Sequence, residues 1–146
     1  MRRGRTIEEE LLLARVARER GRALELRASL VEAAEQTDWA RIAVLYGALA
    51  ELTPSPVVEL NRAVAVAMAF GPAAGLELVD ALTAEPSLKA YHLLPSVRGD
   101  LLAKLGRLDE ARSEFERAAS LTRNAREREL LLERAAACSR SGVSVS

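Results

Sequence analysis

Leu105-Gly106-Arg107-Leu108-Asp109-Glu110-Ala111, followed by Phe115 and Ala118, is the stretch that decides the fold. A glycine between apolar residues, with acidic residues and then a new apolar pattern after it, is typical of a tight turn between two helices. Counted from Gly106, the residues Ala111, Phe115 and Ala118 lie 5, 9 and 12 positions further on. Small residues on either side of one large residue predict a helix that packs closely against its predecessor.

The same spacing occurs near residue 40. Counted from Thr37, the residues Ile42, Tyr46 and Leu49 occupy the same three positions, and Trp39 lies at the start of the helix that they predict. Aromatic residues at such positions more often fill a core than stack on a ligand. We therefore expect Trp39 and Tyr46 to be core residues.

A third copy lies between these two and is less regular. Counted from Gly71, only Leu76 fits, because the other two positions hold polar residues. A start two residues earlier fits better, since it places Ala74, Leu78 and Ala81 at the three positions. The sequence leaves both registers open.

The period of these copies indicates the fold class. From Thr37 to Gly71 and from Gly71 to Gly106 the steps are 34 and 35 residues. A repeat of this length made of two helices is the pattern of tetratricopeptide (TPR) proteins. The sequence therefore predicts an all-α protein, a right-handed antiparallel helix-hairpin solenoid of three TPR-like repeats with capping helices.

We expect one domain over residues 1–146, with N-terminal helices in residues 6–36, a repeat core at 37–122 and a capping helix at 124–138. Thr6 and Glu9 form a capping-box pattern, Gly21 is expected to break the N-terminal region into two helices, and Pro95 is expected to kink or delay a helix. The expected helices span residues 6–20, 23–35, 37–53, 57–70, 72–84, 88–105, 108–121 and 124–139.

Composition excludes several function classes. The 21 basic and 21 acidic residues balance, so no long-range attraction to nucleic acid is expected. His92 is the single histidine and Cys138 the single cysteine, and we expect both to be structural, with no metal or cofactor site. No nucleophile or phosphate-loop motif is present, so we predict that the protein is not an enzyme.

The longest apolar run is too short to span a membrane, and the acidic residues after the basic N-terminus do not form a signal peptide, so we expect a cytoplasmic protein.

The first helices of TPR hairpins line a concave groove, and here that groove is expected to be weakly charged, without clustered cations that would clamp a carboxylate. Asn61 and Arg62 interrupt an apolar helix, so their burial would require partners. Either Asn61 bonds to a neighbouring backbone and Arg62 pairs with an acid such as Asp100, or both face the groove and hold a partner. Arg98 and Asp100 present the same choice. The candidate partner-binding residues are Arg27, Asn61, Arg62, Met68, Ser96, Arg98 and Asp100.

Beyond the repeat, the sequence resembles the C-terminal extension of a subgroup of bacterial extracytoplasmic-function (sigma-24-type) RNA polymerase sigma factors. The likeness covers residues 21–134, and its most specific part is Pro54-Ser55-Pro56-Val57-Val58 with Leu60-Asn61-Arg62-Ala63-Val64-Ala65. Further matching residues are Thr37-Asp38-Trp39, Leu45-Tyr46, Gly71-Pro72-Ala73-Ala74-Gly75-Leu76, Tyr91-His92-Leu93-Leu94, Asp100-Leu101-Leu102, Leu105-Gly106-Arg107 and Glu127-Arg128. Two residues depart from the pattern: Gly99 stands where the family usually has alanine, and Leu130 where it usually has phenylalanine.

The resemblance implies a regulatory domain that tunes transcription initiation through contacts with sigma domains 2 and 4, RNA polymerase or a signalling partner. The two promoter-binding sigma domains do not match any part of these 146 residues, so direct nucleic-acid binding is not expected. The alternatives are a free-standing TPR-like adaptor that binds a peptide and, more weakly, a small-molecule sensor or enzyme with a pocket around Tyr91, His92 and Arg62. The oligomeric state stays open.

Overall fold

The structure, a computed structural model, describes residues 7–142, without the side chains of residues 8–10, 12–17 and 141–142. These residues form seven α-helices and one short 3₁₀-helix, with no strand among them. The elements are α1 (Ile7–Glu35), α2 (Trp39–Leu52), α3 (Pro56–Phe70), α4 (Pro72–Leu82), η1 (Pro86–Leu88), α5 (Leu93–Lys104), α6 (Leu108–Leu121) and α7 (Ala125–Gly142).

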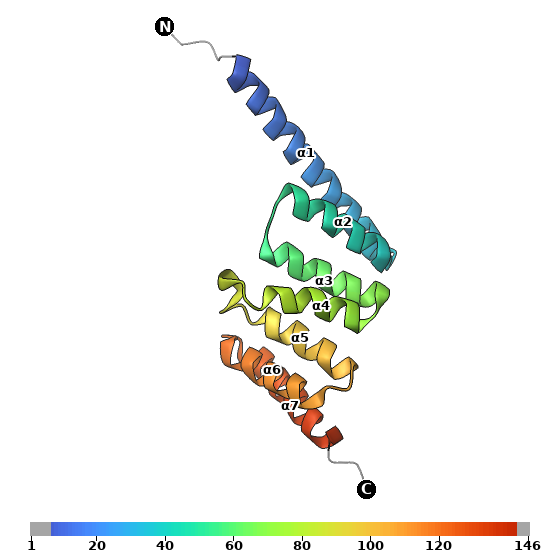
Figure 1. Cartoon of the computed structure of the whole chain (residues 1–146), viewed down its shortest axis with the longest axis vertical. Helices are drawn as coiled ribbons and strands as arrows, with labels where there is room; N and C mark the ends of the chain where they lie inside the picture. The colour runs from blue at the N-terminus through green and yellow to red at the C-terminus, as the bar shows by residue number, and fades with distance from the viewer. Residues whose placement is uncertain (1–6, 143–146) are drawn as a thin grey trace.

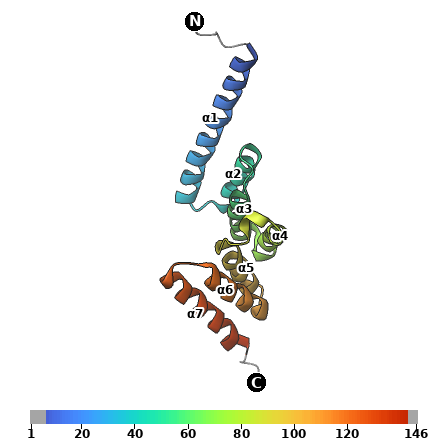
Figure 2. The ribbon, with the colours of Figure 1, turned by 90° about the vertical axis from the view of Figure 1, so that its left-hand side faces the viewer.

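Consecutive helices pair into hairpins, and the hairpins stack into a column from α1 at one end to α7 at the other (Figure 1). The hairpins are α1–α2, α3–α4 and α5–α6, and α7 covers α6. In the side view, α1 and α7 lie on the same side of the column and α4 lies on the opposite side (Figure 2). The expected all-α hairpin solenoid is thus confirmed over the described residues.

The first helix of each hairpin is followed, within two residues of its last residue, by a residue with positive φ. These residues are Thr37 (φ 55°), Gly71 (φ 105°) and Gly106 (φ 79°), and no other residue of the described chain has a positive φ. They are the same three residues from which the repeat was counted in the sequence. The period near 34 residues therefore marks the chain reversals of the solenoid.

Two of these reversals share one hydrogen-bond pattern. After α5, the N–H groups of Gly106 and Arg107 donate to the carbonyls of Ala103 (3.0 Å) and Leu102 (2.9 Å). After α1, Thr37 and Asp38 donate in the same way to Ala34 (3.1 Å) and Ala33 (2.9 Å). This pair of bonds satisfies the last carbonyls of the helix and requires a left-handed residue, a position that glycine usually fills.

Asp38 then begins the second helix of the first hairpin. Its carboxylate accepts a hydrogen bond of 3.2 Å from the backbone N–H of Arg41, so it is the N-cap of α2. In the second hairpin, Pro56 is the first residue of α3 and Pro72 the first of α4, where a missing N–H costs nothing. The expected starts of these helices are therefore correct to within two residues.

The expected break between two helices at Gly21 is wrong, because α1 is one helix of 29 residues that includes Gly21. A Cβ atom added at Gly21 would have no neighbour within 4 Å, and Gly21 does not have a positive φ. A glycine inside a helix costs only about 1 kcal/mol relative to alanine, which the strong helix formers around it offset. The capping box at Thr6 lies outside the described residues.

The sixth expected helix starts later than predicted. Residues Pro86–Leu88 form the 3₁₀-helix η1, and α5 begins only at Leu93. This start places Pro95 in the first turn of α5, where proline is tolerated, so Pro95 delays the helix and does not interrupt it. At the other end of the chain, α7 extends to Gly142 and not only to Ser139.

The largest core lies in the C-terminal two hairpins. Phe115 lies in this core and is 1% exposed. Ala111 and Ala118, which flank it in the repeat pattern, are fully buried. In the first hairpin Ile42 and Leu49 are buried. Trp39 and Tyr46 are only half-buried against a smaller cluster, so the expectation of full core positions is too strong for these two aromatics.

The burial of residues in α4 tests the two registers that the sequence left open for this helix. Gly75, Leu76 and Val79 are buried, whereas Ala81 is exposed and Leu78 is half-buried. The buried face therefore follows neither register: counted from Gly71, Leu76 is buried but Asp80 and Thr83 are exposed, and counted from two residues earlier, Ala81 is exposed. Gly75 makes the closest contact between α4 and α3. Glycine does not stand out as an apolar residue in the sequence, so the spacing of apolar residues did not predict the buried face of α4.

Two glycines allow neighbouring helices to approach closely. A Cβ added at Gly75 would lie 2.4 Å from the Cβ of Ala67 and 2.9 Å from the carbonyl oxygen of Ala63, both on α3. A Cβ at Gly99 would lie 2.9 Å from the ring of Phe115. The glycine at position 99 therefore leaves room for this buried ring.

Exchange of residues between the two equivalent turns tests the role of the positive φ. Thr37→Gly is expected to stabilise the protein by about 0.5–1 kcal/mol, because threonine is strained in the left-handed region. Gly106→Thr is expected to destabilise it by about 1–2 kcal/mol for the same reason. Urea unfolding followed by circular dichroism measures both. Equal destabilisation by the two changes would contradict this account.

The two helix glycines α1 Gly21 and α4 Gly75 form a second matched pair. Gly75→Ala is expected to destabilise the protein by about 1–3 kcal/mol, because the new methyl group overlaps α3. Gly21→Ala places a methyl group in open space and is expected to stabilise the protein by about 0.5–1 kcal/mol. Thermal and urea unfolding measure both changes. A neutral Gly75→Ala variant would show that α3 and α4 do not pack this closely.

Candidate functional site

Three adjoining hollows lie along the helices α1, α2, α3, α5 and α7. Val64 lines both the first hollow, of about 190 Å³, and the second, of about 250 Å³. Ser96 and Arg134 line both the second and a third, of about 340 Å³. We call these three hollows the groove. Its lining residues are Leu30, Ala34, Trp39, Ile42, Tyr46, Asn61, Val64, Ala65, Ala67, Met68, Ser96, Val97, Asp100, Leu101, Lys104, Glu127, Leu130, Leu131, Glu133 and Arg134.

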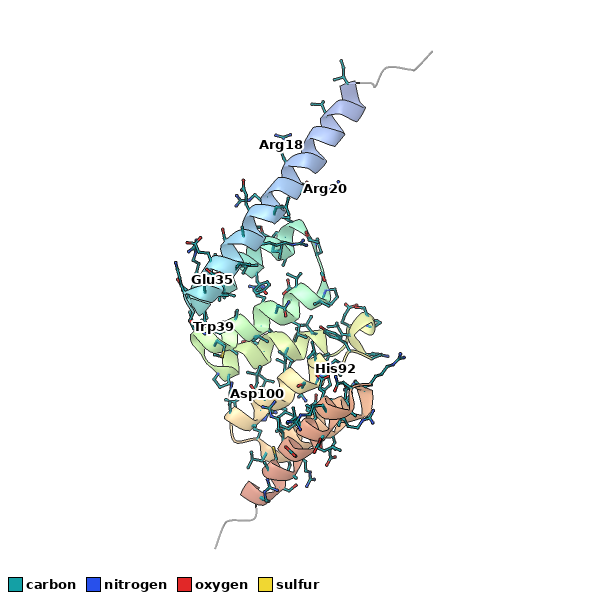
Figure 3. All side chains as sticks on the ribbon, turned by 180° about the vertical axis from the view of Figure 1, so that it is seen from behind. Arg18, Arg20, Glu35, Trp39, His92 and Asp100 are labelled. Carbon is teal, nitrogen blue, oxygen red and sulfur yellow. The ribbon has the colours of Figure 1, made fainter. Side chains whose placement is uncertain are left out.

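The groove is formed by the first helix of each hairpin, by α7 and, in the first hairpin, by three residues of the second helix α2: Trp39, Ile42 and Tyr46. The second hairpin contributes α3, the third contributes α5, and α7 occupies the next position in the stack. Figure 3 views the molecule from behind, with Trp39 near α1 and Asp100 on α5. A continuous surface that crosses successive repeats fits an extended ligand better than a small compact one.

The second hollow combines an apolar floor with a charged rim. Val64, Ala67, Val97 and Leu101 line it with hydrocarbon. Met68, whose side chain is flexible and polarizable, is 49% exposed beside them. An extended apolar segment of a ligand could be buried here.

Three charged side chains meet at the rim of this hollow. Arg134 Nη2 donates a hydrogen bond to Asp100 Oδ1, and Lys104 Nζ lies 3.0 Å from Asp100 Oδ2. The guanidinium carbon of Arg134 also lies 4.6 Å from the ring centroid of Phe115, in a cation–π contact. One carboxylate therefore holds two cations, and the cluster carries a net charge of +1.

Four of the candidate residues line the groove. Met68, Ser96 and Asp100 come together in the second hollow, and Asn61 lines the first beside Trp39 and Tyr46. Asn61 is exposed, so the expectation of a buried side chain bonded to a neighbouring backbone is wrong. Arg27 is exposed on α1 and is not among the residues that line the three hollows.

Of the two alternatives for Arg62, pairing with an acidic residue is the one observed, but the partner is Glu59 and not Asp100. Arg62 is half-exposed, and its Nη1 lies 3.5 Å from Glu59 Oε2 one turn earlier in α3. A Cβ added at Gly47 would lie 3.7 Å from Arg62 Nε, so the side chain lies against α2. Asp100 instead pairs with cations of α5 and α7.

Arg98 has a structural position between helices. Its Nε donates to Asp80 Oδ1 of α4 at 2.8 Å, and its Nη1 lies 3.3 Å from Glu114 Oε1 of α6. Burial opposes its charge, but the hydrogen bond to Asp80 and the charges of both carboxylates outweigh that effect and raise the pKa of Arg98. Arg98 therefore stays charged and ties three helices together outside the groove.

The sequence pattern did not indicate the two groove cations. Lys104 is in no motif, and Arg134 lies in a helix that was expected only to cap the repeats. The structure places Arg134 across the groove at Asp100, 34 positions away in the sequence. The signal present in the sequence is that Arg134 directly precedes Ala135 and lies three residues after Leu131, both buried.

His92 connects the starts of α5 and α7. Its Nε2 lies 2.8 Å from Glu127 Oε1, and Glu127 Oε2 accepts a hydrogen bond of 3.0 Å from the hydroxyl of Thr122. Asn124 caps α7, since its Oδ1 accepts from the N–H of Glu127 at 3.0 Å. These bonds fix one end of the groove, and they agree with a structural role for His92. Glu127 is therefore hydrogen-bonded within the fold.

The described part of the chain can also be examined for metal sites, reactive thiols and membrane-spanning helices. Among the described side chains, no group of three or more histidine, cysteine or acidic residues could hold a metal ion. Cys138 is a free thiol, 7% exposed in the core, as expected for a packing residue. None of the helices between residues 7 and 142 has the length and hydropathy needed to cross a bilayer.

Solved structures of TPR domains share this fold. The first TPR domain of human RPAP3 matches with a TM-score of 0.67 and 24% identity, over 82% of this chain and 93% of that domain. The first TPR of Spaghetti (RPAP3), solved with the HSP90 peptide SRMEEVD, matches with a TM-score of 0.68 and 24% identity, over 85% and 98% of the two chains. At this identity the likeness establishes the fold, which is that of a TPR-like helical solenoid.

A relative in sequence is known from Rhizobium meliloti (strain 1021), where it is an uncharacterized protein. It is 51% identical over 96 residues, which is 66% of this chain. The matched part is 22% of that relative's length, so the relative contains much more than this fold. No protein-family model matches the chain.

Proposed function

We propose that the protein is an interaction module that holds an extended segment of a partner protein in the groove. The observation that carries this proposal is the continuity of the three hollows, which share Val64, Ser96 and Arg134 across successive helices. A peptide in an extended conformation spans several repeats, whereas a small ligand needs only one enclosed pocket. The TPR neighbour solved with the peptide SRMEEVD is consistent with this use of the fold.

The charged rim of the second hollow favours an acidic ligand residue over a basic one at that point, whereas Glu127 and Glu133 line the third hollow. Asp100 already holds two cations, so a ligand cation would have to compete with Lys104 and Arg134 for it. A ligand carboxylate instead meets two cations whose side chains are 50% and 47% exposed. Hydrogen bonds between charged groups are stronger than neutral ones, and they contribute to specificity. The proposed ligand is therefore a peptide with an acidic residue next to apolar side chains.

A peptide array tests this proposal. Seven-residue peptides with one acidic or one basic residue among apolar residues are immobilised and probed with the purified chain, and the best binder is measured by fluorescence polarisation. Acidic peptides are expected to bind best, and Lys104→Gln is expected to weaken the best of them about 5- to 10-fold. Lys89→Gln, an exposed lysine that lines none of the three hollows, is the matched control and is expected to leave binding unchanged. Equal binding by acidic and basic peptides would contradict the ligand chemistry.

We further propose a second candidate function, a regulatory segment of a bacterial sigma factor. The observation that favours it is the resemblance in residues 54–65, which form the turn into α3 and the first part of that helix. Asn61 and Val64 in this segment line the groove, so the residues that carry the resemblance include residues that a partner could contact. In this proposal the partner is a sigma domain or RNA polymerase, and the regulated process is transcription initiation.

A pull-down separates the two proposals. The tagged chain is incubated with sigma domains 2 and 4 of the same bacterium and with its core polymerase. Retention of either is expected, and Met68→Glu is expected to reduce it at least fivefold, because it places a charge on the apolar floor of the groove. Loss of retention together with intact peptide binding would reject the sigma-factor function and leave the adaptor function.

A further inference from the structure

The N-terminal part of α1 projects beyond the hairpin to which it belongs. The helix α1 has 29 residues and its partner α2 has 14. Leu52, the last residue of α2, lines a surface hollow together with Arg18 and Arg22 of α1. Residues 7–17 therefore extend past the end of α2, and both ribbon views show this part of α1 running away from the column (Figures 1 and 2).

This projecting part carries apolar residues that no described helix covers. Ile7 is 76% exposed and Leu11 is 63% exposed. Leu12, Leu13 and Val16 belong to the same stretch of sequence. A single helix of about 11 residues gains little stability in water by itself, and most helices in proteins are stabilised by packing. A partner for this segment would supply that packing.

The charges along this segment would attract a second copy of the segment that runs in the opposite direction. Three glutamates occupy positions 8–10, and four arginines follow at positions 15, 18, 20 and 22 with Glu19 among them, so the second group has a net charge of +3. If two copies lie antiparallel, the acidic group of each copy lies beside the basic group of the other along the pair. A parallel arrangement would instead place like charges together, which is unfavourable. The apolar residues 11–13 lie between the two charged groups and close to the centre of an antiparallel pair.

We propose that a second copy of this chain packs against the projecting part of α1, as an antiparallel helix pair formed by residues 7–22 of each protomer. The two-fold axis passes close to Ala14, midway between the acidic and the basic group. Such an interface is isologous, because the same surface of each copy meets itself. This dimer goes beyond the proposed function and leaves the groove free, because residues 7–22 are not among those that line it.

Charge reversal tests the pairing. The wild-type chain is expected to be a dimer by multi-angle light scattering and sedimentation equilibrium. One variant carries Glu8→Arg, Glu9→Arg and Glu10→Arg, and a second carries Arg15→Glu, Arg18→Glu and Arg22→Glu. Each variant alone is expected to be a monomer, and an equimolar mixture of the two is expected to form a heterodimer. The matched control, Arg117→Glu, Arg123→Glu and Arg126→Glu on exposed residues of α6, the following turn and α7, is expected to stay a dimer.

Three outcomes would overturn the proposal. They are a wild-type chain that stays monomeric up to about 1 mM, reversed variants that each remain dimeric, and a mixture that stays monomeric. Far-UV circular dichroism verifies that the variants keep the helical fold.

Disulfide trapping gives a second measurement that does not depend on charge reversal. In a Cys138→Ala background, Ala14→Cys is expected to form a disulfide-linked dimer on mild oxidation. Val44→Cys, at a position that is 72% exposed on α2, serves as the control and is expected to stay monomeric. Equal crosslinking of the two would overturn the antiparallel pair.

Discussion

The left-handed turn at the end of the first helix in each hairpin is the constraint on which the rest of this structure depends. Thr37, Gly71 and Gly106 reverse the chain so sharply that the next helix packs directly against the one before it. At Thr37 and Gly106 the same two backbone hydrogen bonds close the turn. Because the turns recur every 34 or 35 residues, the hairpins repeat in one direction and stack into a column.

Close packing between helices depends on small residues at the contact points. Gly75 allows the backbone of α4 to approach Ala63 and Ala67 of α3, and Gly99 leaves space for the ring of Phe115. A methyl group at either position would overlap a neighbour, so the distance between these helices is set by the absence of side chains as much as by apolar area. The chain thereby forms a packed core with few aromatic residues.

The groove follows from this stacking. The first helices of the hairpins contribute to one surface, with α2 beside α1 in the first hairpin and α7 at the other end, so residues from separate repeats line it. Asp100 holds Lys104 from its own helix and Arg134 from α7, and Arg134 also packs over Phe115. The charged rim is thus attached to the buried core, which positions the two cations before any ligand arrives. Pre-positioned side chains lose less conformational entropy on binding.

The sequence by itself determined the helices, their turns and the period of the repeat, because these depend on local chemistry. Proline at the start of α3 and α4, glycine or threonine at the chain reversals and apolar spacing in α6 act within a few residues of each other. The tertiary structure decided the rest: the continuity of α1 through Gly21, the buried face of α4, and the partners of Asp100, Arg62 and Arg98. These features depend on which helices meet, and that is set by the packing of residues tens of positions apart. Periodicity along one helix carries no information about which charged side chains of other helices come within reach.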